Sequence, residues 1–297
     1  MLHSVKEQTV GRWHGILTAM GIAEKFLTGK HTACPACGGK DRWRWDDKDG
    51  RGTYFCTFCG SGDGWMLLNL VKGLSFKESA IEIERLVGSV PIVQQRPVML
   101  AEERSRRLNQ IWAEARPLQR GDDLDLYLLS RGLSYGGLEI RLHPGLEYRD
   151  GAEVLGKFPC MLAIVRGVDG KGVTIHRTYL HGGKKADVPS PRKLMPGSGR
   201  GVVRLAEASG CVGIAEGIET ALAASKRFLM PVWSAISANG LETFEVPAGI
   251  TEVVIFGDND ASFTGQSAAY ALARRLVAAG VRVSVQIPPS LGDWADV

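Results

Sequence analysis

The 297-residue sequence predicts an α+β protein of several modules, and three observations support this prediction. Two Cys-x-x-Cys pairs lie near the N-terminus, within a stretch rich in glycine and aromatic residues. The C-terminal third alternates between apolar strands and helical segments, which is typical of a parallel sheet flanked by helices. The net charge changes from +6 over residues 98–205 to −5 over residues 206–297. We therefore expect a small cysteine-bearing module, a basic mixed α/β segment and an acidic α/β domain, in this order.

The composition excludes several classes of protein. With 44% hydrophobic and 23% charged residues the chain is of the globular type, and it has no run of eighteen apolar residues that could cross a membrane. Residues 1–18 carry charges and lack the apolar core of a secretory signal. No GxxxxGK[ST] loop is present, which argues against a P-loop motor in this chain. We expect a cytoplasmic protein whose six cysteines are free or bind metal.

Residues 1–90 are expected to form one domain. Residues 5–28 have the apolar spacing of one or two helices. Ser75 and Glu78 form a capping box that opens a further helix. One face of that helix carries Phe76, Ala80, Ile83 and Val87. Residues 91–99 contain two prolines and two glutamines and are predicted to be a linker.

The remainder of the chain divides near residue 205. Helices are expected over residues 100–115 and 124–129, followed by short strands broken by glycine and proline: 161–166, 172–180 and 202–205. The predicted order is then strand 211–215, helix 218–228, strand 232–236, strand 252–256, helix 262–279 and strand 281–287. Apolar strands joined by helices predict a parallel, doubly wound sheet.

The cysteine pairs have the spacing of a zinc ribbon, with eighteen residues between the pairs. The four candidate ligands are Cys34, Cys37, Cys56 and Cys59. Each pair is followed by a glycine, which eases the turn of the backbone around the sulfur atoms. Four thiolates fill the coordination sphere of one zinc ion, so we expect the zinc to be structural. His31 is an alternative ligand, and two unrelated Cys-x-x-Cys pairs are the alternative interpretation.

The segment between the cysteine pairs alternates basic and aromatic residues. If it is a strand, Arg42 and Arg44 share one face and Trp43 and Trp45 share the other. We expect the tryptophans to fill the small core of the ribbon. The arginines are expected to contact phosphates of a single nucleic-acid strand, with a solvated face as the alternative.

Acidic residues follow two of the predicted C-terminal strands. Glu216 follows the first strand, and Asp258 and Asp260 follow the third. Because the carboxyl ends of parallel strands share one edge of the sheet, we expect these three carboxylates to converge. Close carboxylates need hard cations, which predicts a site for Mg²⁺ or Mn²⁺ that supports phosphoryl or nucleotidyl transfer. Helix capping by the aspartates is the alternative.

Further polar residues are candidates for the same site. Glu219, Asp293 and Asp296 could reach this edge, although a glutamate in the first turn of a helix is also a common partner of the helix dipole. The basic segment offers a set of residues suited to the phosphates of a nucleotide or template: His176, Arg177, Lys184, Lys185, Arg192 and Lys193. A solvated basic loop is the alternative for this set.

These motifs together resemble a known family. Glu216-Gly217 followed by Asp258-x-Asp260 resembles the Toprim domain of primases, topoisomerases and some nucleases. Residues 31–65 resemble the zinc ribbon of alpha-type primase-helicases from satellite phages and related mobile elements. The similarity extends to residues 127–133, 176–180 and 292–296, although an Asn more often precedes the last Asp of the family. Those relatives carry a helicase after the primase, whereas this sequence ends before one.

The resemblance implies a DNA primase that makes short RNA primers on single-stranded DNA for a phage, plasmid or integrated mobile element. It implies a template-binding zinc-ribbon domain over residues 1–90, a basic subdomain of the primase core over 100–205 and a Toprim catalytic domain over 206–297. Glu216 is similar to the proposed general base of the family, and Asp258 and Asp260 are similar to its metal ligands. Ribonucleoside triphosphates and a separate helicase are the implied partners.

Other functions use the same motifs. A Toprim nuclease would activate water with the same carboxylates and would need no ribonucleotides. A recombination mediator with a zinc site and a Toprim fold would bind DNA without incorporating any nucleotide. A topoisomerase is less favoured, because the chain is short for a protein that encircles DNA around a nucleophilic tyrosine. The primase-like ribbon favours the primase.

Overall fold

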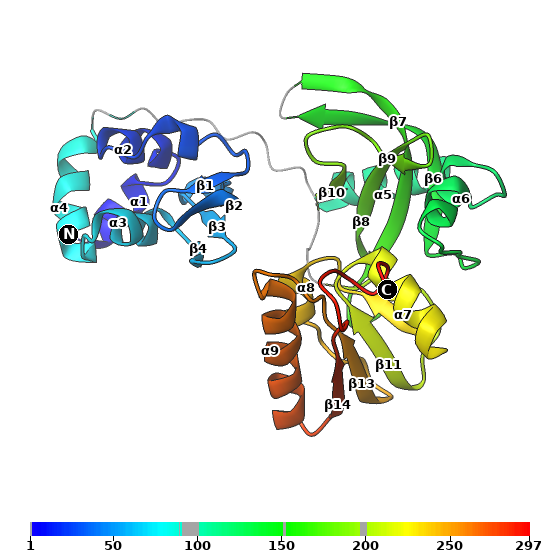
Figure 1. Ribbon diagram of the computed structural model, residues 1–297. Helices are drawn as coiled ribbons and strands as arrows, with labels where there is room; N and C mark the ends of the chain where they lie inside the picture. The colour runs from blue at the N-terminus through cyan, green and yellow to red at the C-terminus, as the bar shows by residue number, and fades with distance from the viewer. Residues whose placement is uncertain (1, 89, 91–100, 151–152, 197–200) are drawn as a thin grey trace. The chain divides into compact units, whose positions relative to one another are not determined.

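The computed structural model describes residues 2–88, 90, 101–150, 153–196 and 201–297. The chain forms two compact units, Met1–Met99 and Leu100–Val297 (Figure 1). The linker predicted over residues 91–99 lies outside the described residues. None of the helices in the described parts of the chain combines the length and apolar character of a membrane span.

The first unit surrounds a small antiparallel sheet with helices. The sheet has the order β1 (Thr32–Cys34), β2 (Gly38–Trp45), β3 (Tyr54–Cys56), β4 (Gly60–Gly62). The helices are α1 (Leu2–Gln8), α2 (Trp13–Ala19), α3 (Gly64–Lys72) and α4 (Phe76–Leu86), with short 3-10 turns at Glu24–Phe26 and Lys48–Gly50. The helices expected within residues 5–28 are therefore present as two short ones.

The tryptophans of β2 form the centre of this unit, as predicted. Trp43 is fully buried and Trp45 is 8% exposed. The Trp43 ring stacks on Tyr54 with 4.8 Å between ring centres, and its indole N–H donates to the Phe26 carbonyl at 2.8 Å. Strand alternation thus places one face of β2 in the core and leaves the other to solvent.

Helix α4 begins at the predicted capping box. The Ser75 amide donates to Glu78 Oε2 at 2.8 Å, and the Glu78 amide donates back to Ser75 Oγ at 3.4 Å. Ala80, Ile83 and Val87 are buried, as their spacing predicts. Phe76 is 41% exposed instead, because it lies in the first turn at the edge of the core.

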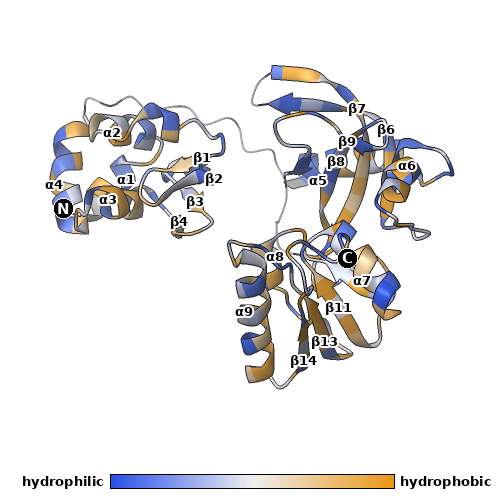
Figure 2. Cartoon of the chain, in the orientation of Figure 1, coloured by the Kyte–Doolittle hydropathy of each residue, from blue (hydrophilic) through white to orange (hydrophobic). Residues whose placement is uncertain are grey.

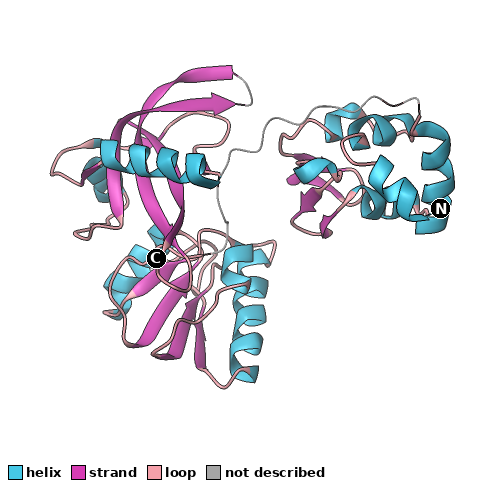
Figure 3. Cartoon of the chain, turned by 180° about the vertical axis from the view of Figure 1, so that it is seen from behind, coloured by secondary structure: helices cyan, strands magenta, loops and turns pink. Residues whose placement is uncertain are grey.

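The second unit begins with an antiparallel sheet. Its order is β10 (Arg192–Leu194), β8 (Gly172–His181), β7 (Glu153–Arg166), β6 (Ile140–Asp150), β5 (Arg116–Pro117), and β9 (Lys184–Lys185) pairs with β8. Helix α5 (Ala101–Glu114) covers one face and is seen across the strands in Figure 3. Helix α6 (Asp123–Ser130) packs on the other face through Leu124 and Leu128.

The strand predicted over residues 172–180 is present as β8, whereas that predicted over 202–205 is reduced to isolated bridges at Val202 and Val203. The strands before β8 are much longer than predicted. Strands β6 and β7 are 11 and 14 residues long and contain Pro144 and Pro159. The pairing shifts between His143–Cys160 and Leu146–Phe158, so both prolines lie at one β-bulge. A bulge tolerates proline because its residues do not complete the regular hydrogen-bond ladder.

The second unit ends in the predicted parallel sheet. Its strands have the order β12 (Val232–Ser234), β11 (Gly210–Ala215), β13 (Ile250–Phe256), β14 (Arg282–Gln286). Figure 2 shows the apolar character of β11 and β13. Helix α7 (Ile218–Phe228) packs on one face, whereas α9 (Thr264–Ala278) and the short, unpredicted α8 (Ala238–Glu242) pack on the other.

Helix α7 also joins the two sheets of this unit. Its Ala221 and Ala224 share one buried cluster with Phe256 of the parallel sheet and with Met161 and Leu180 of the antiparallel sheet. The start of α7 therefore lies where the acidic and basic segments meet.

Candidate active site and zinc centre

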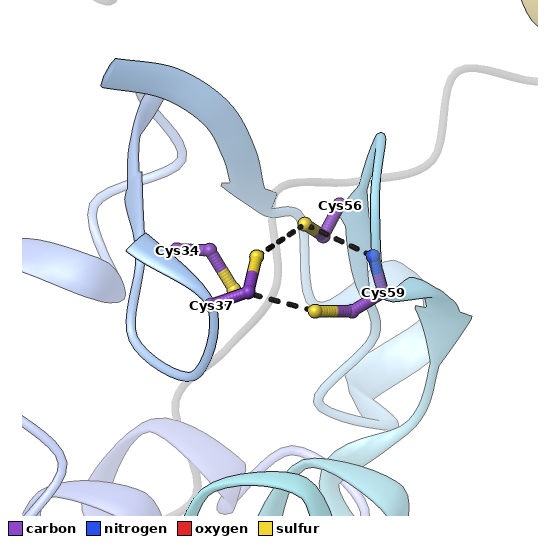
Figure 4. Close-up of side chains that lie close together, drawn as sticks. All are labelled: Cys34, Cys37, Cys56 and Cys59. Atoms are coloured by element: carbon purple, nitrogen blue, oxygen red, sulfur yellow. Dashed lines mark hydrogen bonds between the residues drawn. The ribbon is translucent and has the colours of Figure 1, made fainter. Parts of the chain in front are cut away.

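The four cysteines of the ribbon come together at two hairpin turns. Their sulfur atoms lie within 4.8 Å of one another, and Figure 4 shows them turned toward a common centre. Cys37 Sγ is 3.7 Å from Cys56 Sγ, and Cys34 Sγ is 3.9 Å from Cys59 Sγ. Zn–S bonds of about 2.3 Å place the corners of a tetrahedron about 3.8 Å apart. The four thiols therefore fit one zinc ion.

The backbone around the sulfur atoms also fits a metal site. One amide in each turn donates to a sulfur atom at 3.4 Å: Ala36 to Cys34 and Cys59 to Cys56. The glycines after the two turns, Gly38 and Gly60, have φ values of 72° and 86°, a conformation that glycine adopts without strain. These amides orient the thiolates from outside the coordination sphere.

The ligand set is closed by cysteine alone. His31, the alternative ligand, places its Nδ1 3.1 Å from the Asp41 carbonyl oxygen. Among the described residues no histidine or acid joins the group of four sulfur atoms. Four thiolates leave no open coordination position, so the zinc that fits here is structural.

The solvent face of the ribbon sheet is basic and aromatic. Arg42 and Arg44 lie on this face of β2, and Arg44 pairs directly with Phe55 of β3. Phe58, in the second hairpin turn, is 75% exposed, and its ring centre lies 5.7 Å from the Arg42 guanidinium carbon. Exposed rings beside guanidinium groups are the surface composition that contacts bases and phosphates of a single strand.

A pocket of about 290 Å³ opens where the carboxyl ends of β11 and β13 meet the antiparallel sheet. Its wall is formed by Arg131, Lys185, Arg192, Glu216, Gly217, Glu219, Thr220, Asp258, Asp293 and Asp296. All the acids of this wall come from residues 206–297, and all the cations come from residues 100–205. The charge difference seen in the sequence is therefore brought together in one site.

Glu216 and Asp258 are half-buried acids on this wall, and neither has an ion-pair partner among the described residues. Burial raises the pKa of both, and for Asp258 the charges of Glu216, Asp293 and Asp260 help to raise it to about 7. Asp258 Oδ1 is buried and has no hydrogen-bond donor in the described structure. An unpaired oxygen in acidic surroundings is a position that a divalent cation fills.

Of the three predicted metal ligands, Glu216 and Asp258 line the pocket but Asp260 does not. In the described parts of the chain only the cysteines bring three or more ligand atoms within 4.8 Å of one another. Asp260 is not part of the pocket wall, because its carboxylate accepts the amides of Thr264 and Gly265 at 3.2 and 2.8 Å and caps α9. Burial raises its pKa, but these hydrogen bonds and one from Ser262 outweigh that effect and lower it.

The two acids that follow the last strand reach the pocket. Burial raises the pKa of Asp293, although the Ala295 amide donates to its Oδ1 at 2.6 Å. Asp296 Oδ1 lies 3.5 Å from an Arg131 guanidinium nitrogen. Trp294, between the two acids, is 5% exposed and anchors this segment in the core.

Glu219 lies in the same pocket but in a different environment. It is 6% exposed, and its Oε1 accepts a hydrogen bond from the Tyr127 hydroxyl and lies 2.9 Å from Lys185 Nζ. Burial alone would raise its pKa, but Lys185 and the two hydrogen bonds lower it to about 2. Glu219 is therefore an ionised carboxylate whose charge is balanced by Lys185, whereas the neighbouring Glu216 and Asp258 have no ion-pair partner in the described structure.

Strand alternation divides the predicted basic residues between the two faces of the antiparallel sheet. Three belong to the face that meets the parallel sheet: His176, Lys185 and Arg192. Three belong to the opposite face: Arg177, Lys184 and Lys193. On that second face Arg177 donates to Tyr179 Oη at 3.1 Å, and Lys193 Nζ lies 4.1 Å from the Tyr148 ring centre.

His176 contributes no positive charge to the site. It is 7% exposed, and burial lowers its pKa to about 4. Its Nδ1 has no hydrogen-bond partner in the described structure. His176 is therefore a neutral ring with an unused polar atom.

Two residues that contact acids of the pocket have no role predicted from their chemistry in the sequence: Arg131 of the pocket wall, and Tyr127, which donates to Glu219. Arg131 is the C-terminal cap of α6, and Tyr127 lies on the same helix. Both belong to the segment 127–133, whose resemblance to primases was the available signal. Their position depends on the packing of α6 against distant strands, which no local pattern shows.

Three family matches cover most of the chain. Residues 29–65 match the zinc-binding domain of primase-helicase, residues 211–297 match the Toprim domain, and residues 102–205 match a domain of unknown function (DUF7146). The protein is thus a Toprim-domain protein. It combines that domain with a zinc ribbon that matches the zinc-binding domain of primase-helicase.

Solved structures of primases are similar to the chain at low identity. The zinc-binding and RNA polymerase domains of the Aquifex aeolicus primase share 15% identity, with 99% of this chain and 81% of that chain covered and a TM-score of 0.47. The primase fragment of the bacteriophage T7 primase-helicase shares 16%, with 90% and 92% covered and a TM-score of 0.40. A Pseudomonas aeruginosa DNA primase domain shares 13%, with 65% and 72% covered and a TM-score of 0.43. The assignment rests on the family matches.

Proposed function

We propose that this protein is a DNA primase that synthesises short RNA primers on single-stranded DNA. The observation that carries the proposal is the two-sided pocket, found in a chain with a primase-type zinc ribbon. On one side lie Glu216 and Asp258, and on the other lie Arg131, Lys185 and Arg192. Nucleotidyl transfer needs both, because acids hold divalent cations and cations hold triphosphate oxygens.

Mg²⁺ or Mn²⁺ would be held by Glu216 and Asp258 of the pocket wall in this proposal. Asp260, the predicted third ligand, would join them only by releasing the α9 amides that its carboxylate accepts. The unpaired Asp258 Oδ1 and the raised pKa of Asp258 fit such an ion. When bound, the ion would lower the pKa of the attacking hydroxyl and offset charge on the leaving pyrophosphate. Glu216 is the candidate base, because burial raises its pKa toward the range in which a carboxylate accepts a proton efficiently.

The cations of the pocket would hold the triphosphate. Lys185 and Arg192 present charged groups to the side of the pocket that faces the acids, and Arg131 lies beside Asp296. His176 offers a neutral hydrogen-bonding atom on the same face of the sheet. Arg177, Lys184 and Lys193 belong to the other face and are left out of the proposed nucleotide site.

The solvent face of the ribbon would bind the template. Arg42 and Arg44 supply charge for phosphates, and Phe55 and Phe58 supply rings for bases. We further propose that the protein acts in the cytoplasm in the replication of a phage, plasmid or mobile element. As the similar T7 protein is a primase-helicase, we propose that this chain also works beside a helicase that exposes its template.

Incubation of the protein with labelled ribonucleotides, Mg²⁺ and single-stranded DNA of varied sequence tests the proposal. A primase yields short labelled RNA that depends on the template. Asp258→Asn serves as the control, because it keeps the shape of the side chain and removes its charge. The same reactions with labelled DNA and no ribonucleotides test for a nuclease.

Each alternative predicts a different result. Cleavage of DNA without incorporation would favour the Toprim nuclease. DNA binding that survives Glu216→Gln, with neither incorporation nor cleavage by the unmodified protein, would favour the recombination mediator. Either result would overturn the primase proposal.

A further inference from the structure

Glu219 is bound from the opposite side of the pocket. Its Oε1 accepts the Tyr127 hydroxyl and lies 2.9 Å from Lys185 Nζ, and the Lys185 ammonium lies 6.0 Å from the centre of the Tyr127 ring. Tyr127 belongs to α6 and Lys185 to β9, whereas Glu219 belongs to the first turn of α7. The three residues therefore form one cluster that links the basic and acidic segments.

This environment is unsuited to a metal ligand. Glu216, Asp258 and Asp293 have no ion-pair partner in the described structure, so a divalent cation would relieve their repulsion. Glu219 already has an ammonium group at 2.9 Å. A second cation on the same carboxylate would be repelled by that ammonium.

The cluster instead fixes the position of a flexible side chain. The backbone of Lys185 is held by its pairing with Leu180 of β8. The four-carbon side chain beyond it has several rotatable bonds, and the contact with Glu219 restrains them. Lysine loses much rotamer freedom when it binds a phosphate, and a lysine that is already held loses less.

We propose that Glu219 and Tyr127 are positioning residues that hold the Lys185 ammonium in the pocket for the phosphate oxygens of the incoming nucleotide. Because Gly217 links Glu216 to the helix that carries Glu219, the same contact fixes the cation relative to the acidic wall. The inference rests on the proposed function, since it takes a nucleoside triphosphate as the ligand. It also assigns Glu219 a role other than metal binding.

Two binding measurements on the full chain test this role. The first is the affinity for inorganic tripolyphosphate with Mg²⁺, by calorimetry. The second is the affinity for Mn²⁺ without any phosphate, by electron paramagnetic resonance. Glu219→Gln is expected to weaken tripolyphosphate binding about three- to tenfold, the scale of one side chain that must be immobilised anew. Its Mn²⁺ affinity should stay within about twofold of the unmodified protein, because no ligand is lost.

Three variants accompany this measurement. Tyr127→Phe keeps the ring, removes one hydrogen bond and is expected to give a smaller loss in the same direction. Asp258→Asn should show the reverse pattern, with Mn²⁺ binding most affected. Glu252→Gln is the matched control, because Glu252 pairs with Arg282 at 3.2 Å outside the pocket and should change neither affinity.

A double-mutant cycle decides whether Glu219 acts through Lys185. Lys185→Met should weaken tripolyphosphate binding, and adding Glu219→Gln to it should cause no further loss. Losses that multiply would overturn the inference, as would a loss of Mn²⁺ affinity in Glu219→Gln as large as that in Asp258→Asn. If Glu219→Gln and Tyr127→Phe both lower thermal stability but leave tripolyphosphate affinity unchanged, the contact only stabilises the fold. This result would also overturn the inference.

The outcomes separate this inference from the proposed function. A protein that binds tripolyphosphate and shows the expected cycle, but makes no primers, retains the positioning role and loses the primase assignment. A protein that makes primers but shows multiplying losses retains the assignment and loses the positioning role. Failure of the unmodified protein to bind tripolyphosphate would overturn the inference directly.

Discussion

The zinc ribbon and the acidic pocket of this chain are built in opposite ways. In the ribbon, four cysteines from two neighbouring hairpin turns already hold their sulfur atoms within 4.8 Å. In the pocket, acids from three separate loops line one wall, and no three of them form such a group among the described residues. The ribbon thus holds a complete set of zinc ligands, whereas the acids of the pocket do not form a complete ligand set.

The structural role of zinc in the ribbon and the function proposed for the pocket account for this difference. A structural zinc adds its binding free energy to folding, so the ligands and the folded backbone favour the same geometry. A site that exchanges ions and substrate must remain open, and its like charges then destabilise the protein that contains it. The raised pKa values of Glu216, Asp258 and Asp293 are a direct sign of that cost.

The largest expected effect is loss of zinc from the ribbon. Cys56→Ser should abolish zinc binding and unfold residues 31–66 together with the helices packed on them. Structural zinc contributes on the order of 10 kcal/mol, and Trp43 and Tyr54 of the ribbon share one buried cluster with those helices. Residues 100–297 should stay folded, since they form a separate unit. Metal analysis and limited proteolysis measure the two effects. Cys211→Ser, in the other unit, is the matched control, and full zinc retention by Cys56→Ser would contradict the four-thiolate site.

The next effect separates catalysis from template binding. Asp258→Asn should reduce primer synthesis by about a thousandfold or more, the scale of losing one charge that stabilises a transition state. Template affinity should be unchanged or slightly higher, because a negative charge near DNA is removed. Gel assays of primers and of DNA binding measure both. Asp169→Asn, on an exposed turn, should change neither, and near-normal synthesis by Asp258→Asn would place the active site elsewhere.

The sequence predicts the ribbon better than the pocket for a physical reason. Cysteine spacing and strand alternation are local, so Cys34 to Cys59 and the burial of Trp43 could be inferred from a short segment. The parallel sheet could be predicted equally well, because its central strands β11 and β13 are rich in apolar residues and alternate with helical segments. The zinc site and the parallel sheet are confirmed by the structure and the family matches.

The pocket depends on packing between distant segments. That Glu216 and Asp258 share an edge follows from the sheet, but the contact of Glu219 with Tyr127 joins residues 92 positions apart. The division of the basic residues between two faces required the register of β8 with β9 and β10. The roles of the individual pocket residues therefore remain proposals.

A smaller effect concerns folding stability: replacing a candidate metal ligand should stabilise the pocket, whereas it should destabilise the ribbon. Asp258 has a pKa of about 7 in the folded protein, above its ordinary value of 3.8. Its ionisation therefore destabilises the metal-free fold by an amount that grows from about pH 4 to pH 7 and is complete above pH 7. Without divalent cations, Asp258→Asn should stabilise residues 100–297 by about 1–2 kcal/mol at pH 8, after discounting for solvent screening, and by almost nothing at pH 4.

Urea unfolding at the two pH values, in buffer without divalent cations, measures this stabilisation. Replacing Asp258 would then raise the free energy of unfolding of residues 100–297, whereas replacing Cys56 unfolds the ribbon. A variant less stable than the unmodified protein at pH 8 would mean that Asp258 is compensated in the folded state. The contrast between the two regions would then be lost.

The smallest expected effect concerns the solvent face of the ribbon. Replacing Arg42 and Arg44 together with alanine should weaken single-strand binding several-fold at low salt, since two phosphate contacts are lost. The slope of log affinity against log salt should fall by about 1.4, because each contact to a single strand releases about 0.7 counterion. Lys77→Ala with Arg85→Ala, on the exposed surface of α4, is the matched control for lost charge.

An equal change in both double variants would mean that binding follows the net charge of the unit. No change in either would mean that Arg42 and Arg44 are only a solvated face. A change confined to the Arg42 and Arg44 variant would show that the ribbon, fixed in shape by its zinc, presents these arginines to the template as a defined surface.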